Sequence, residues 1–155
     1  MVRMHPSALL GQLEIVVSRT TGRPEAVFDL AAAPATAVED ALVYYRRVRF
    51  TEPALEADTV GRMRALDGLS DQAHRGGDQT LPAVFRVSAA SARTVAEAAA
   101  LYVADRNVES YQSPEERNRI ALLTDLSEPL RQVAVDLRSA EIRLDDQAGA
   151  AGARS

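Results

Sequence analysis

The sequence predicts an all-α protein, an antiparallel helical bundle of about four main helices with shorter helices at the N-terminal end. Apolar residues make up 46% of the chain but aromatic residues only 5%, so Ala, Leu and Val carry the apolar content. Ala is the best helix former. Near the C-terminus, apolar residues recur at alternating spacings of three and four, which is typical of a helix packed lengthwise on others. The predicted loops are short, which favours antiparallel neighbours.

Residues 9–30 allow two interpretations. Apolar residues at helical spacing, followed by Gly22 and Pro24 as a stop signal, favour a helix. Alternating apolar residues over 13–17, a turn, and a second apolar run at 27–30 are instead typical of a β-hairpin. We expect the helix, because the surrounding sequence is rich in Ala.

Three further helices are expected between residues 24 and 73. Residues 24–33 should form a short helix that ends at Pro34. Apolar residues at helical spacing predict a longer helix over 35–50. Thr51 is then a suitable N-cap for a helix that continues to about residue 73.

Residues 81–108 should contain another long helix, which begins at Pro82 or after a break near Ser88. Residues 94–108 carry a T-V-x-E-A-A opening and resemble the helix-turn-helix pattern of bacterial transcriptional regulators. The resemblance implies DNA contact in the major groove, with the C-terminal helix as the dimerisation element. The DNA-contacting residues it implies are Asp105, Arg106, Asn107 and Glu109. We favour one unbroken helix, because Tyr102 stands where those regulators usually carry Gly.

The final helix has the clearest start in the chain. Ser113 is a good N-cap, Pro114 suits the first helical position, and Glu116 completes a capping box. We expect a single helical domain over residues 1–146, followed by a flexible tail at 147–155 that is rich in Gly and Ala.

A long apolar seam marks this final helix. Its members are Leu123, Leu126, Leu130, Val133, Leu137, Ala140 and Leu144. Pro129 lies inside the helix, where proline costs about 3 kcal/mol because it removes a backbone donor. The spacing nevertheless passes from Leu126 to Leu130 without a slip, so we expect one continuous helix that is kinked near Pro129.

Val135 and Ile142 lie on the flank opposite this seam, where a helix with one buried face normally carries polar residues. Either the N-terminal helices cover this flank, or it is an exposed strip that binds a partner helix or a second copy of the chain. In the second case, Arg131, Arg138 and Asp136 would fix the register of the partner through their charges.

The expected function is therefore non-catalytic protein–protein interaction, as an adaptor or assembly subunit that acts through an apolar helix face. A homodimer is the simplest form, because a second copy can complete the exposed strip. The alternative is a DNA-binding regulator of the helix-turn-helix class. A third interpretation is an enzyme that uses no cofactor, with a polar pocket near Asp71, His74 and Tyr102.

Composition excludes several classes of site. The net charge of −4 argues against non-specific nucleic-acid binding, and the absence of Cys excludes disulfides and thiolate ligands. All 18 basic residues are Arg, which we attribute to a GC-rich bacterial coding background. No apolar run approaches the roughly 20 residues that span a bilayer, so we expect a cytoplasmic protein without membrane contact.

Two smaller clusters carry potential chemistry. Asp71 and His74, with Asp78 nearby, could supply part of a metal site, but this is no metal signature, so we expect no metal and no cofactor. Residues 44–50 interleave aromatic residues with Arg, as single-strand nucleic-acid binders do. The same arginines would also complement the dipole at a helix C-terminus, which is the interpretation we favour.

Overall fold

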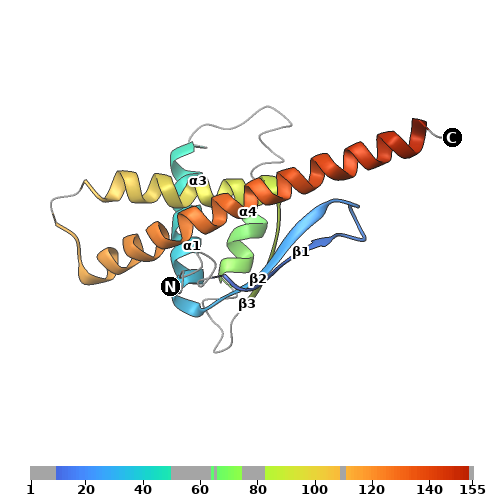
Figure 1. Cartoon of the computed structure of the whole chain (residues 1–155). Helices are drawn as coiled ribbons and strands as arrows, with labels where there is room; N and C mark the ends of the chain where they lie inside the picture. The colour runs from blue at the N-terminus through green and yellow to red at the C-terminus, as the bar shows by residue number, and fades with distance from the viewer. Residues whose placement is uncertain (1–9, 50–63, 65, 75–82, 109–110, 154–155) are drawn as a thin grey trace, which may run out of the picture.

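The computed structural model describes residues 10–49, 64, 66–74, 83–108 and 111–153. In chain order its elements are β1 (Gly11–Val17), β2 (Pro24–Leu30), α1 (Ala32–Arg49), a helical segment at 66–74, β3 (Ala83–Ser88), α3 (Ala89–Arg106) and α4 (Pro114–Ala153). Figure 1 shows α3 and α4 side by side and antiparallel, with α1 crossing behind them and the β1–β2 hairpin running along the C-terminal half of α4.

The prediction of an all-α fold is wrong, because the chain also forms a three-stranded antiparallel sheet in the order β1-β2-β3. Strand β2 is central and its burial alternates along the chain. Ala26, Phe28 and Leu30 face the helices, and the Phe28 ring stacks on Phe85 directly opposite in β3, with centroids 5.8 Å apart. This inner face of the sheet continues the hydrophobic core of the helices.

The favoured helix over residues 9–30 is also wrong, and the alternative hairpin is the structure. Gly22 is not a helix stop but a turn residue, with a φ of +69° that Gly adopts without strain. The Ser18 hydroxyl accepts hydrogen bonds from the backbone N–H groups of Thr20 and Thr21, which closes the turn. Pairing across the hairpin outweighs the helix propensity of the surrounding Ala residues.

The short helix expected over 24–33 does not form, because these residues enter β2. Pro34 does not end a helix. It lies in the first turn of α1, where the backbone N–H that proline lacks would have no partner within the helix. The helix expected over 35–50 corresponds to α1. In the next expected helix, residues 66–74 are helical, whereas Thr51 lies outside the described residues.

Helix α3 begins at the break near Ser88, and β3 occupies the residues before it. The Ser88 hydroxyl caps the helix by accepting from the N–H of Ser91 at 3.2 Å. The helix then runs unbroken to Arg106. The turn that a helix-turn-helix motif requires near Tyr102 is therefore absent from α3.

Helix α4 follows the prediction closely at its start. The Ser113 hydroxyl accepts from the N–H of Glu116 at 3.1 Å, and the helix is continuous through Pro129. The buried members of the predicted seam are Leu123, Leu126, Leu130, Val133 and Leu137. The last two, Ala140 and Leu144, are partly buried, and the helix continues past residue 146 to Ala153.

Among the described helices, none has a stretch both long enough and apolar enough to cross a membrane.

Candidate functional site

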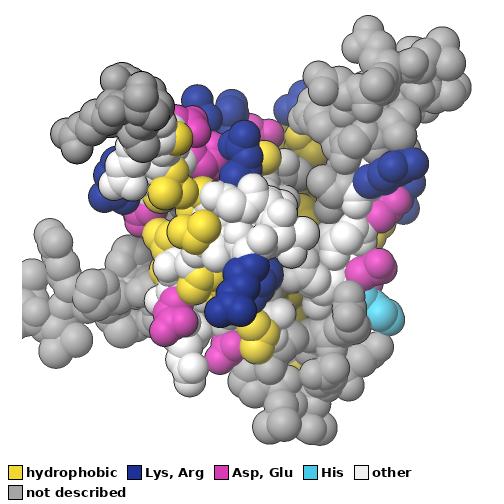
Figure 2. Space-filling model, turned by 90° about the vertical axis from the view of Figure 1, so that its right-hand side faces the viewer, with side chains coloured by type: hydrophobic (Ala, Val, Ile, Leu, Met, Phe, Trp, Pro, Cys, Tyr) yellow, Lys and Arg dark blue, Asp and Glu magenta, His cyan; other side chains and the backbone are white. Residues whose placement is uncertain are grey.

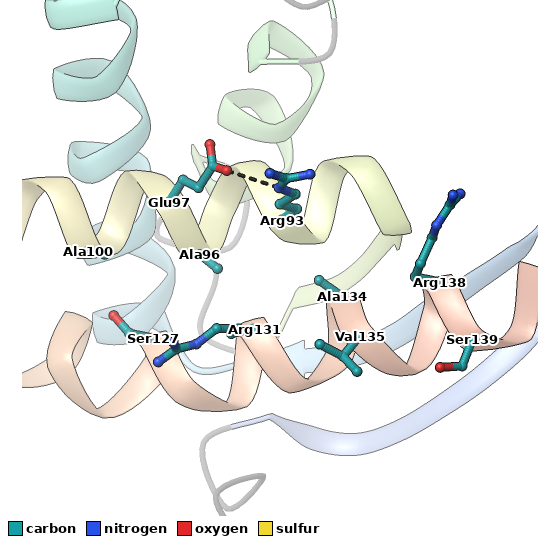
Figure 3. Close-up of a pocket in the computed structure, with 10 residues that line it drawn as sticks. All are labelled: Arg93, Ala96, Glu97, Ala100, Ser127, Arg131, Ala134, Val135, Arg138 and Ser139. Carbon is teal, nitrogen blue, oxygen red and sulfur yellow. Dashed lines mark hydrogen bonds and ion pairs between the residues drawn. The ribbon is translucent and has the colours of Figure 1, made fainter.

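A groove of about 560 Å³ opens between α3 and α4. Small and apolar side chains form its floor, and they come from both helices. They are Ala96 and Ala100 from α3 and Ala134 and Val135 from α4. Figure 3 shows Ala96 directed from α3 toward α4, with Ala134 and Val135 on the facing part of α4. Val135 is 53% exposed, so its isopropyl group is available to a ligand.

Charged side chains form the rim of the groove. Arg131 and Arg138 extend from α4 on either side of Val135 (Figure 3). Across the groove on α3, the Arg93 Nε atom lies 3.1 Å from a carboxylate oxygen of Glu97. The rim therefore carries three guanidinium groups and one carboxylate.

Each rim arginine has a local acidic partner. Arg131 pairs with Glu128, and Arg138 lies 3.3 Å from Glu141, both three residues away on the same helix. The arginine side chains of these pairs are about two-thirds exposed. In the Arg131–Glu128 pair both side chains are exposed, and such a pair contributes only about 0–1 kcal/mol, so Arg131 can exchange partners at little cost. Glu141 is only 12% exposed and also faces Arg23, so Arg138 is held more firmly.

A second cluster of polar groups joins α1, α3 and α4 around Tyr102. The Tyr102 hydroxyl donates to Glu116 at 2.8 Å and accepts from Arg119 at 3.2 Å. Arg119 also contacts Asp40 of α1 through Nε at 2.8 Å. The Arg106 guanidinium lies 5.5 Å from the centroid of the Tyr102 ring and at the same distance from Tyr44.

The protonation states of Tyr102 and Arg119 suit a structural role for this cluster. Burial raises the pKa of the Tyr102 hydroxyl, Arg119 opposes the shift, and Glu116 adds to it. Burial lowers the pKa of Arg119, but its hydrogen bond to Tyr102 and its anionic neighbours outweigh that effect and raise it. At neutral pH the hydroxyl therefore keeps its proton and the guanidinium its charge. Both are suited to holding three helices together.

Comparison with family models, with curated proteins and with solved structures found no match to this chain. Function must therefore be inferred from the geometry of the groove itself.

The structure brings together three of the five predicted interface residues. Val135, Arg131 and Arg138 line the groove. Asp136 accepts a hydrogen bond from Gln132 at 2.9 Å and is not among the lining residues. Ile142 is 49% exposed and also lies outside the groove.

The α3 side of the groove was missed by the sequence analysis. Ala92, Ala96 and Ala100 recur at intervals of four residues, which places small side chains on one face of the helix. This pattern was a usable signal for close helix approach. It could not show which face would remain open beside α4.

Two of the four residues implied in DNA contact, Asp105 and Arg106, have side-chain partners within the protein. The Tyr44 hydroxyl donates to Asp105 at 2.7 Å, and Arg106 faces Glu116 at 3.8 Å. The backbone N–H of Asn107 donates to the last turn of α3, and Glu109 lies outside the described residues.

The remaining clusters also have internal partners. His74 lies 3.0 Å from Glu39, and no group of three metal-ligating side chains occurs within the described ranges; Asp78 lies outside them. In the segment over 44–50, Tyr45 is buried and Arg46 pairs with Asp67.

Proposed function

We propose that this protein is a non-catalytic interaction module that binds a helix of a partner protein in the groove between α3 and α4. The observation that carries the proposal is the half-exposed Val135 on a floor of alanines, between two helices that are otherwise well packed. A groove between two neighbouring helices is a common docking site for the apolar face of a third helix.

The alanines of the floor set the kind of ligand that fits. Because Ala96 and Ala134 project only a methyl group, a docked helix can approach the backbones of α3 and α4 closely. Leucine-sized side chains on the incoming helix would then supply the bulk that the floor lacks. Burial of one such side chain contributes about 1.5–3 kcal/mol.

The charges on the rim define the flanks of the partner. Three arginines and one glutamate line the groove, so the charged groups that face a ligand are mostly positive, although Glu128 and Glu141 pair with two of these arginines from outside the groove. A partner helix with carboxylates beside its apolar face would match Arg131 and Arg138. The preferred ligand is therefore an amphipathic helix with acidic flanks.

The experiment uses two synthetic helical peptides with the same leucine face and either Glu or Lys on the flanks. We expect the Glu peptide to shift amide NMR signals of residues 93–100 and 127–139, and to bind at least ten times more tightly than the Lys peptide. Higher salt should weaken this preference.

Val135→Asp should abolish peptide binding, because it places a carboxylate on the apolar floor. Ala121→Asp is the matched control: it adds the same charge to α4 at an exposed position outside the groove, and should bind as the wild type does. Equal binding by the two variants, or signal shifts confined to other surfaces, would refute the proposal.

A further inference from the structure

The two edge strands of the sheet differ in whether their outward backbone N–H and C=O groups form hydrogen bonds. At the β3 edge, the Gln72 side chain acts as a substitute strand. Its amide oxygen accepts from the N–H of Arg86 at 2.9 Å, and its amide nitrogen donates to the C=O of the same residue at 3.4 Å. This contact blocks the pairing of β3 with another strand at that position.

The β1 edge has no such cover among the described residues, because β1 pairs only with β2. The N–H of Ser18 donates to the C=O of Arg23 at 2.9 Å, so the backbone of Ser18 faces β2. Backbone groups alternate in direction along an antiparallel strand. The N–H and C=O groups of Ile15 and Val17 therefore point away from β2, toward the open edge.

The same two residues carry exposed apolar side chains. Ile15 is 46% and Val17 is 56% exposed, although they lie opposite the buried residues Ala26 and Pro24 and hence on the helix-facing side of the sheet. The helices cover β2 but leave β1 open. Figure 2, which views the end where the β1–β2 turn and the α4 C-terminus project, shows hydrophobic side chains exposed among charged ones.

We infer that the β1 edge is a homodimer interface, at which β1 pairs antiparallel with β1 of a second copy of this chain. A two-fold axis beside Val16 places Ile15 opposite Val17 of the second copy, and Val17 opposite its Ile15. Both are hydrogen-bonded pairs, so all the outward backbone groups of these two residues are satisfied. The four side chains meet on one face of a continuous six-stranded sheet.

The register with Ile15 opposite Val17 is the one that keeps all the paired residues within the regular part of β1. Slipping the pairing by two residues keeps the same side chains on the same face. However, one slip would pair Val17 with Leu13, in the irregular part of β1 between Gly11 and Glu14. The opposite slip would pair Ile15 with Arg19, which lies in the turn.

Charge complementarity favours a second copy over an unrelated strand. Glu14 stands at the start of the regular part of β1 and Arg19 just beyond its end, and neither forms an ion pair with another described residue. In this antiparallel register each Glu14 stands opposite Ser18 of the other copy, one residue before its Arg19. Opposite charges of the two copies therefore lie at both ends of the interface. The blocked β3 edge stops further growth, so the assembly closes at two copies.

The experiment measures the mass of the full chain by analytical ultracentrifugation over micromolar to millimolar concentrations. At the upper end of this concentration range, we expect the wild-type protein to have twice the monomer mass of 16.7 kDa. Val17→Lys should sediment as a monomer at every concentration, because it places a charge at each contact with the second copy. Val84→Lys should remain dimeric: it makes the same substitution at a 64% exposed position on β3.

Hydrogen exchange on the wild-type chain tests the register without any substitution. The amides of Ile15 and Val17 should exchange at least ten times more slowly in the dimer than after dilution to monomer, whereas that of Val16 should be protected in both states. A chain that is monomeric throughout, a dimer that Val17→Lys leaves intact, or equal exchange of Ile15 and Val17 in both states would overturn the inference.

Discussion

Tyr102 shows how one side chain can connect three helices. Its hydroxyl lies between a carboxylate and a guanidinium of α4, and through Arg119 it is linked to Asp40 of α1. The Glu116 side chain is only 13% exposed, so water cannot fully replace the hydroxyl if it is removed. Arg119 and Arg106 still face this carboxylate, but a hydrogen bond to a charged group contributes more than one between neutral groups.

Tyr102→Phe is therefore expected to lower the free energy of unfolding by about 1–3 kcal/mol. Urea denaturation followed by circular dichroism measures this change. Tyr111→Phe is the control. Because Tyr111 is 79% exposed, this variant should have the same free energy of unfolding as the wild type. A Tyr102→Phe variant as stable as the control would show that the network contributes nothing.

The raised pKa of Tyr102 also predicts a loss of stability in alkali. In the unfolded chain the phenol titrates near its ordinary value of about 10. Between that pH and the higher folded-state pKa, the unfolded state binds fewer protons than the folded one, so stability falls as pH rises. Unfolding curves recorded on either side of pH 10 should show this decline in wild type, and a smaller decline in Tyr102→Phe.

At the scale of elements, α4 combines two regions with different surroundings. From Ile120 to Leu137 its apolar seam is fully covered by the rest of the protein. Beyond Leu137 the seam is only partly buried, and the helix projects with the β1–β2 hairpin beside it (Figure 1). The Arg23 side chain of the hairpin reaches Glu141 at 3.7 Å, which ties the two together. Equivalent leucines along α4 should therefore contribute unequally to stability.

Leu137→Ala should lower the free energy of unfolding by about 2–5 kcal/mol, because Leu137 has no exposed surface and its loss leaves a cavity. Leu144→Ala makes the same substitution on the partly buried stretch and should cost clearly less. Chemical denaturation of both variants compares them directly. Equal losses would mean that the projecting part of α4 is packed as tightly as its middle.

At the scale of the molecule, the inner face of the sheet, α1, α3 and the first half of α4 share one hydrophobic core. Among the described residues, the groove floor around Val135 and the β1 edge are apolar surfaces that lie outside this core. They lie on different elements, so binding at one need not occupy the other. An assembly in which a dimer presents two grooves is consistent with both inferences.

Val135→Asp should leave this core intact. Because Val135 is half exposed, we expect the free energy of unfolding to change by less than about 1 kcal/mol, with helix content unchanged. Circular dichroism and thermal unfolding check both quantities. If the variant unfolds, Val135 belongs to the core, and the groove is not a free surface.

Of the candidate groove, the side formed by α4 could be predicted from the sequence, and the side formed by α3 could not. Val135, Arg131 and Arg138 could be placed on the flank opposite the seam, because the heptad phase of one helix fixes the directions of its own side chains. Ala96 and Ala100 could not be placed beside them. Which helix packs alongside α4, and at what angle, depends on contacts that no single helix encodes.

The sequence by itself determined the local features: the Ser113 cap, the buried seam of α4 and the apolar stripe of α1. Each depends on residues a few positions apart, where spacing and propensity decide the outcome. Only the tertiary structure decided the sheet. Strand β2 is stable because Phe28 meets Phe85, and Ala26 meets both Ile15 and Val87, in segments brought together by folding. That pairing overrides the local preference of an Ala-rich chain for helix.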